Sequence, residues 1–322
     1  NYESQATIKD RNFAIRFISD IAFNKTDLKA NTYDMEFYGD LDGNGMAIGE
    51  LRLISDTDFE TNSEGQKVEY LGLFGRIITK NPGKANAKRG VVRNLNINVA
   101  EVRGSKVTYV GSLAGEIQNA NVFNINITGE EVIQGKNIVG GLAGIISGDS
   151  EVVNITSSLS AKASYYKYPN LFKATNSQLE DSQYGKFEIY NKTEVGGALK
   201  VKNAETISYV GGIAGVYDVD PRPENEQNKQ SLFNAKARSL EVNGNVSLVG
   251  EVVGGVFGLI GKDSTSSDIK FYISDGASPE LIGSRVIGGL AGENRGSIER
   301  AVISHTNETQ KEIDNAYKAS AV

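Results

Sequence analysis

A glycine-rich hexapeptide recurs six times along this chain of 322 residues, and its apolar and glycine positions keep the same order in each copy. The clearest version reads Val-Gly-Gly-Leu-Ala-Gly, and most copies recur after about 30 to 40 residues. Repeats of this size are units too small to bury an apolar face alone, so they stack on their neighbours. The copies lie at residues 71–75, where the motif is one residue shorter, and at 110–115, 139–144, 210–215, 253–258 and 287–292.

Glycine supplies 36 of the 322 residues, and its excess over an average protein lies mainly in these repeats. A glycine in regular structure destabilises it by about 0.5 to 1 kcal/mol relative to alanine. Such regular placement therefore indicates positions where a side chain does not fit or where φ is positive. The interval from Gly144 to Gly215 is about twice the others, so we expect a degenerate or interrupted repeat between residues 145 and 210.

A second unit recurs between the hexapeptides, a short alternating strand rich in asparagine and isoleucine, as at residues 92–99. Its period of two places Leu95, Ile97 and Val99 on one face and the asparagines on the other. Asparagine can also occupy left-handed corners and bond neighbouring backbone. A helical solenoid is disfavoured, because each glycine would destabilise a helix by about 1 kcal/mol. We therefore predict an all-β fold, a right-handed parallel β-helix-like solenoid.

The expected organisation is one elongated body. Residues 1–60 are predicted to form N-terminal strands and a cap, and residues 61–306 the repeat solenoid. Insertions are expected at about 163–192, which is rich in aromatic residues, and at 218–230, which is polar and contains proline. Residues 307–322 are expected to form a C-terminal tail or a short helix.

Composition excludes several classes of protein. The net charge of −6 argues against a nucleic-acid partner, since phosphate binding needs a basic surface. The basic residues Lys80, Lys84, Lys88 and Arg89 fit either a solvated hairpin tip or a contact with an acidic partner. Cysteine is absent, which excludes disulfides, and no apolar run is long enough to span a membrane. Because the sequence starts at Asn1 without methionine, we expect a segment of a longer protein.

The repeats resemble a known family. The copies at 139–144 and 209–215, with the segments 39–45 and 70–75, look like bacterial GLUG repeats. Their arrangement over roughly residues 10–305 is similar to the non-catalytic N-terminal region of immunoglobulin A1 protease-like zinc metalloproteases of Gram-positive cocci. The resemblance implies an exported protein attached to the bacterial cell surface or cell wall. It also implies zinc in the parent protein, and as partner a host protein such as immunoglobulin A, or the parent's protease domain.

Catalytic constellations are missing from this segment. The zinc site of that family is a His-Glu-x-x-His helix with a further glutamate, whereas His305 is the single histidine here. One histidine without cysteine supports neither a catalytic zinc nor a nucleophilic triad. Parallel β-helices also host carbohydrate enzymes, which use paired carboxylates, but the repeats present glycine and apolar residues and tryptophan is absent. We predict no catalytic residue and no cofactor in this segment.

One segment resembles half of a calcium loop. Asp40, Asp42 and Asn44 supply oxygen atoms at positions one, three and five, and Gly45 stands at position six. Position twelve is Leu51 instead of the usual glutamate, although a glutamate precedes it. A glycine-rich corner leading into a strand explains the same residues without a metal, so both interpretations stay open.

The aromatic insertion is the candidate for recognition. Tyr165, Tyr166, Tyr168 and Phe172 lie within it, and tyrosine is enriched at interfaces because it buries large area with few rotatable bonds. These rings would contact a partner or, alternatively, seal the flank of the solenoid where a repeat is interrupted.

The expected function is that of a non-catalytic structural and recognition module in a secreted, cell-wall-attached zinc metalloprotease. The alternative is a stand-alone bacterial surface adhesin module that binds host protein or glycan. A carbohydrate enzyme is the third class.

Overall fold

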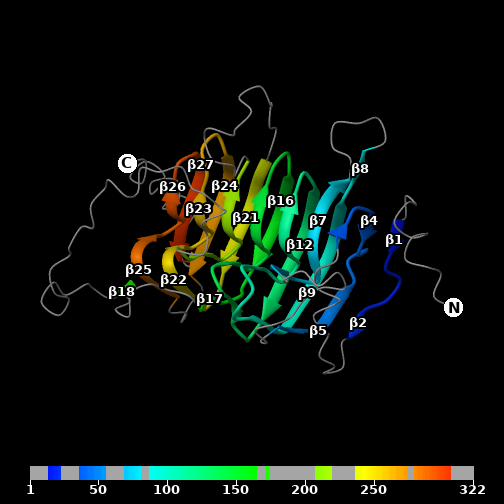
Figure 1. The fold of residues 1–322 in the computed structure, drawn as a ribbon, viewed down its shortest axis with the longest axis horizontal. Coiled ribbons are helices and arrows are strands. Elements are labelled where there is room, and N and C mark those ends of the chain that lie inside the picture. Colours follow the sequence, from blue (N-terminus) through cyan, green and yellow to red (C-terminus); the bar gives the residue numbers. More distant parts are fainter. Residues whose placement is uncertain are drawn as a thin grey trace, which may run out of the picture.

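The computed structural model describes residues 14–22, 36–55, 69–80, 87–164, 172–174, 207–219, 236–273 and 279–305. Every regular element among them is a β-strand, and the sheets are mostly parallel. The described residues therefore contain no helix long and apolar enough to cross a membrane. The colours of the chain run from blue to red along the long axis, so the strands follow one another in sequence order (Figure 1).

The strands of the first half are β1 (Ala14–Arg16), β2 (Ile21–Ala22), β3 (Glu36–Phe37), β4 (Asp40–Asp42), β5 (Ala47–Ile54), β6 (Tyr70–Leu71), β7 (Phe74–Lys80), β8 (Lys88–Arg89), β9 (Val91–Gly104), β10 (Tyr109–Val110), β11 (Ala114–Gln118), β12 (Asn121–Gly129), β13 (Ile133–Gly135) and β14 (Ile138–Gly140). Those of the second half are β15 (Ala143–Ser147), β16 (Glu151–Ser157), β17 (Ala161–Ala163), β18 (Phe172–Ala174), β19 (Tyr209–Gly211), β20 (Ala214–Asp218), β21 (Lys236–Asn243), β22 (Ser247–Gly254), β23 (Phe257–Ile260), β24 (Thr265–Ile273), β25 (Glu280–Gly288), β26 (Ala291–Asn294) and β27 (Ser297–His305).

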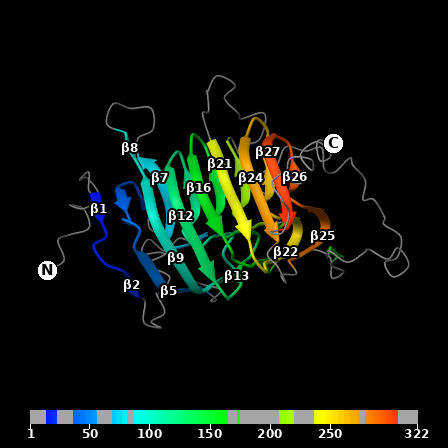
Figure 2. The same cartoon turned by 180° about the vertical axis from the view of Figure 1, so that it is seen from behind.

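Parallel pairing joins each strand to its counterpart in the next repeat. The longest run of pairings, called here the long ladder, starts with β1 and β2, continues with β4 and β5, and then follows β9, β12, β16, β21, β24 and β27. Figure 2 shows its later strands side by side. A separate sheet stacks β3, β7, β11, β15, β20, β23 and β26. This arrangement is consistent with a β-helix-like solenoid.

The six hexapeptides stack in register. Val139 pairs with Val110 on one side and with Val210 on the other, and the alanines Ala143 and Ala214 pair in the same way. The pairing Val139 to Val210 joins the two copies on either side of the long interval directly. No degenerate coil therefore lies between them, and the repeat is instead interrupted by an insertion after β17 (Ala161–Ala163).

The glycines of the hexapeptide allow two backbones to touch. A Cβ on Gly144 would lie 2.7 Å from Val110 N and 2.8 Å from Gly115 O, both in the preceding repeat. A Cβ on Gly140 would lie 2.5 Å from Ala214 Cα in the following repeat. Neither glycine has a positive φ. Of the two reasons for glycine expected from the sequence, lack of space is the one that applies in these copies.

The core consists mainly of buried Val, Leu and Ile side chains, together with some Ala, Phe and Tyr. Leu95, Ile97 and Val99 are each at most 1% exposed, which confirms the predicted inward face of that strand. Val92 is fully buried as well, so the alternation is interrupted between positions 92 and 95. The extra residue is Asn94, which adopts a left-handed φ of 56°.

The structure describes some of the segments predicted outside the repeats. The strands expected near the N-terminus are β1 and β2, at the start of the long ladder. The expected hairpin is present, with Thr79 opposite Arg89 and Lys80 opposite Lys88, although residues 81–86 lie outside the described part. The insertions and the C-terminal segment 307–322 lie almost wholly outside it as well.

Candidate functional site

The surface of the stack carries two polar regions, and the first adjoins the calcium candidates predicted from the sequence. The first is a column of residues that directly precede the same inward position in successive strands of the long ladder and have φ between 51° and 57°. We call it the asparagine column. It consists of Asn94, Asn124, Asn154, Ser239, Asp268 and Arg300.

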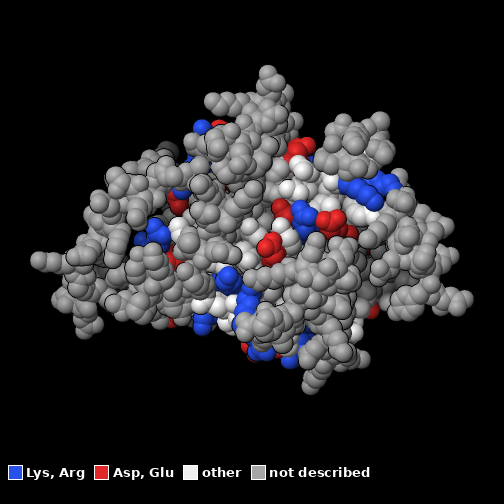
Figure 3. Space-filling view, in the orientation of Figure 1, with Lys and Arg blue, Asp and Glu red and all other residues white. Residues whose placement is uncertain are grey.

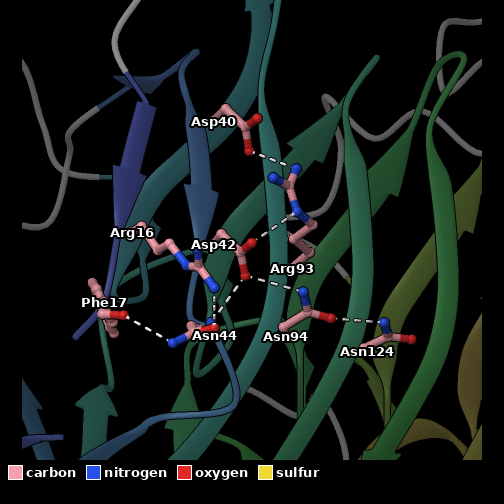
Figure 4. Close-up of polar contacts among 8 residues, drawn as sticks. All are labelled: Arg16, Phe17, Asp40, Asp42, Asn44, Arg93, Asn94 and Asn124. Atoms are coloured by element: carbon pink, nitrogen blue, oxygen red, sulfur yellow. Dashed lines mark hydrogen bonds and ion pairs between the residues drawn. The ribbon is translucent and has the colours of Figure 1, made fainter. Parts of the chain in front are cut away.

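Side-chain amides link the first three members. Asn124 Nδ2 donates to Asn94 Oδ1 at 2.8 Å, and Asn154 Nδ2 donates to Asn124 Oδ1 at 2.9 Å. Asn94 Nδ2 in turn donates to Asp42 Oδ1 at 3.0 Å, so a carboxylate ends the row (Figure 4). Each amide carries one donor group and one acceptor, which lets the same contact repeat from strand to strand.

The other end of the column uses charge. Arg300 Nε donates to Asp268 Oδ1 at 2.7 Å, and Arg300 NH2 donates to Asp268 Oδ2 at 2.9 Å. The hydrogen bond from Arg300 is the largest cause of the lowered pKa of Asp268. Two bonds to one carboxylate fix the guanidinium in the plane of that group.

The predicted calcium residues lie together at the start of the column. Asp42 Oδ1 accepts from the backbone N–H of Asn44 at 2.9 Å, as well as from Asn94. Asp40 Oδ1 accepts from Arg93 NH1 at 2.7 Å, and Asn44 Oδ1 accepts from Arg16 NH2 at 2.6 Å (Figure 4). Two guanidinium groups thus contact the oxygen atoms that would bind a cation.

Further observations bear on the metal. The pKa of Asp42 is lowered first by the hydrogen bond from Asn94, then by the backbone of Asn44, and also by the two arginines. Leu51, at position twelve of the loop pattern, is fully buried. No group of three or more His, Cys, Asp or Glu among the described residues could hold a metal ion. The contacts favour the glycine-rich corner, in which Gly45 has a φ of 76°, and calcium binding stays a prediction.

The second polar region includes two stacked tyrosines. Tyr70 on β6 pairs with Tyr109 on β10, and their ring centroids are 5.1 Å apart with an interplanar angle of 14°. Arg76 Cζ lies 5.2 Å from the centre of the Tyr70 ring, which is cation–π distance. Burial, followed by the charge of Glu116, raises the pKa of Tyr70.

Arg76 connects this aromatic pair to acidic groups. Its Nε donates to Glu116 Oε2 and its NH1 to Glu36 Oε1, both at 2.7 Å. Glu116 is only 6% exposed and also accepts from the Ser147 hydroxyl at 3.2 Å. Acidic and basic groups lie side by side near the middle of the face drawn in Figure 3. We call Tyr70, Tyr109, Arg76, Glu36 and Glu116 the tyrosine–arginine cluster.

This cluster was not predicted from the sequence, although a signal was present. The residue directly before the hexapeptide is Tyr70, Tyr109 or Tyr209 in three of the six copies. These residues occupy one outward column of parallel strands, together with Ile138 and Val252. The column becomes more buried toward the middle of the chain, where Tyr209 is 3% exposed.

Most side chains of the remaining predicted residues lie outside the described part of the structure. Tyr165, Tyr166 and Tyr168 lie outside the described residues. Phe172 begins β18, which pairs antiparallel with β25, but its side chain is not described. His305 is the last residue of β27, and its side chain is likewise outside the described part. The predicted contact role of these rings therefore stays a prediction.

The two regions bring together charges, amides and aromatic rings, and the charged groups of Arg76, Asp42 and Asp268 each have a protein partner. Such an arrangement can recognise a partner by stacking and charge-assisted hydrogen bonds. Comparisons with protein-family models, with curated proteins and with solved structures find no match.

Proposed function

We propose that the chain is a right-handed parallel β-helix-like solenoid of GLUG repeats with a short N-terminal β cap, and that it serves as a non-catalytic recognition module. In this proposal it belongs to a secreted, cell-wall-attached zinc metalloprotease. It keeps the distant protease domain in position and engages a host protein, for which immunoglobulin A is the candidate.

The observation that supports this proposal most is the in-register stack of hexapeptides. Direct backbone packing at Gly140 and Gly144 leaves little freedom between successive repeats, because a shift would bring backbone atoms into overlap. A stack of this kind transmits position along its length and offers a broad flank to a partner. Both properties suit a spacer that also binds.

The tyrosine–arginine cluster supports the recognition role. Tyr70 and Tyr109 are partly exposed and Arg76 lies beside them, and tyrosine and arginine are the residue types enriched at interfaces. The hydrogen bonds from Arg76 to Glu36 and Glu116 hold the guanidinium in place before any partner arrives, which lowers the entropic cost of binding.

A binding assay on the full 322-residue chain tests the proposal. Immobilised immunoglobulin A1 is presented to the purified protein, in parallel with an array of other host proteins and host glycans. We expect binding to a protein, and we expect Tyr109→Ala to weaken it by about tenfold or more, as an interfacial tyrosine does. Tyr272→Ala is the matched control, since Tyr272 is also partly exposed but lies on β24 in the long ladder.

The outcomes separate the candidate functions. Binding to glycans but to no protein would favour the stand-alone adhesin, because stacked tyrosines also form a platform for sugar rings. Cleavage of a glycan or protein by the purified chain, with zinc or calcium added, would overturn the non-catalytic role. An equal effect of Tyr109→Ala and Tyr272→Ala would remove the cluster from the recognition surface.

A further inference from the structure

Both ends of the long ladder expose isoleucines that belong to interior columns. At the C-terminal end, Ile303 is 47% exposed, whereas Phe271 beside it in the same column is 4% exposed. At the N-terminal end, Ile21 is 38% exposed, whereas its neighbour Ile48 is 2% exposed. Burying such side chains is favourable in proportion to the apolar area removed from water.

The strands that carry these residues are also sheet edges. Within the described residues, β27 pairs with β24 alone, β1 with β4 alone and β2 with β5 alone. The outer side of such a strand presents backbone N–H and C=O groups with no strand beside them, which is a template for a further strand. Among the described residues, the long ladder therefore has one edge without a neighbouring strand at each end, and the edge strands run in the same parallel sense.

The register of the ladder relates the two edges to each other. Following the pairings from strand to strand, Ile15 and Ile298 occupy one inward column, at its first and last positions. Ile21 and Ile303 occupy the two ends of a second inward column.

Charges lie at the ends of an outward column. Arg16 and Glu299 are its first and last residues, and both are exposed. The carboxylate of Glu299 is held only loosely, with Arg300 NH1 at 3.7 Å. Placed opposite each other on neighbouring strands, residues of opposite charge favour pairing and residues of like charge oppose it.

We propose that the occupant of these edges is a second copy of this chain, added head to tail. Strand β27 of one copy pairs in parallel with β1 and β2 of the next copy and continues the register of the ladder. Ile298 then lies opposite Ile15, Ile303 lies opposite Ile21, and Glu299 lies opposite Arg16. The contact joins two different surfaces, so it does not close a dimer and leads to open chains of copies.

Sedimentation velocity of the full chain over a range of concentrations tests this arrangement. The wild-type protein is expected to form a series of species beyond the dimer as concentration rises. Ile303→Lys blocks the C-terminal edge and Ile21→Lys blocks the N-terminal edge, so each variant alone is expected to be monomeric. A mixture of the two retains one intact edge of each kind and is expected to stop at a one-to-one heterodimer. Val132→Lys is the matched control, since Val132 is 41% exposed between β12 and β13, away from both edges.

The charge pair gives a second readout. Glu299→Arg is expected to weaken association by about tenfold or more, because it places two positive charges together. Arg16→Glu combined with Glu299→Arg is expected to restore it. Circular dichroism confirms that each variant is folded. A wild-type protein that is monomeric at every concentration would overturn the proposal and leave the edges to another protein or to another part of this chain. An effect of Val132→Lys equal to that of Ile303→Lys, or no rescue by the double charge reversal, would overturn it as well.

Discussion

The glycine hexapeptide and the asparagine column place unusual demands on the backbone of two different kinds. In the hexapeptide a neighbouring backbone leaves no room for a side chain, whereas in the asparagine column φ is positive. The glycines of the hexapeptide have ordinary φ values and are needed because another backbone occupies the space of a side chain, as at Gly144. The asparagine column has left-handed φ values yet contains no glycine. Five of its six members carry side chains that bond another member of the column.

Glycine in this repetitive chain is placed mainly where space is short. Ten described residues other than glycine have positive φ, against three glycines, so left-handed conformation is mostly not the reason for the abundance of glycine. Asparagine tolerates the left-handed region better than most residues. In a stack, it also gains hydrogen bonds from its neighbours, as Asn124 does from both sides, and these offset the cost of its backbone conformation.

The largest effect is expected from a methyl group added to the hexapeptide. In Gly144→Ala the new Cβ would lie within 3 Å of backbone atoms of Val110 and Gly115, and stacked backbone on both sides cannot move away. We expect the free energy of unfolding to fall by about 3 kcal/mol or more, measured by urea unfolding.

Gly49→Ala is the matched control for that change. The nearest atom to its added Cβ is Ile21 O at 3.8 Å, which is ordinary contact, and its φ is not positive. We expect a change within about 0.5 kcal/mol. Equal effects of the two substitutions would show that close backbone packing is not the reason for glycine in the hexapeptide.

The next largest effect is expected in the asparagine column. Asn124→Val forces a β-branched residue into a φ of 53° and removes both amide bonds. We expect a loss of about 2 to 3 kcal/mol in unfolding free energy. Asn124→Gly removes the bonds without the strain, so it should lose only about 1 kcal/mol. Asn126→Val, at an exposed position without positive φ, should change stability little, and a large loss there would contradict the role given to φ.

Sequence reasoning predicted the parts of the fold that repeat. Periodicity alone predicts that the elements are strands and that the hexapeptides stack. It also predicts that Leu95, Ile97 and Val99 face inward. Each copy has the same local pattern, so one reading applies to all of them. The long interval between Gly144 and Gly215 could not be interpreted from the sequence, since a degenerate coil and an insertion account equally well for its length. Only the direct pairing of β14 with β19 decides between them.

The sites were harder to predict because they join residues that no local pattern connects. Asp42 is followed 52 positions later by Asn94, yet one hydrogen bond joins them, since the strands between fold into neighbouring positions of the ladder. The calcium-loop pattern concerns only the order of oxygen-bearing residues along the sequence. It does not predict that Arg93 and Arg16 contact the side-chain oxygens of Asp40 and Asn44. The tyrosines that precede the hexapeptides can be recognised as one column only when the strands are known to be parallel and in register.

One substitution in the asparagine column is expected to stabilise the protein. Ser239 follows Asn154 in the asparagine column with a φ of 54°, and its short side chain ends the row of amides. Ser239→Asn places an amide beside Asn154 in a conformation that asparagine tolerates better. We expect the free energy of unfolding to rise by about 0.5 to 1 kcal/mol. A destabilised variant would mean that the row of amides does not extend to this strand.

The smallest effect concerns the charged end of the same column. The pKa of Asp268 is lowered by Arg300, so the pair stabilises the folded state above the ordinary carboxyl pKa and loses this contribution as pH falls through the lowered value. Both side chains are more than a third exposed, which limits the contribution to about 0.5 kcal/mol. The difference in stability between wild type and Arg300→Gln should therefore disappear between about pH 5 and pH 2, measured by urea unfolding. The loss caused by Asn124→Gly should persist over the same range, since an amide does not titrate. If both losses vanished together, the two ends of the column would depend on one shared titrating group, and the distinction between an amide end and a charged end would be wrong.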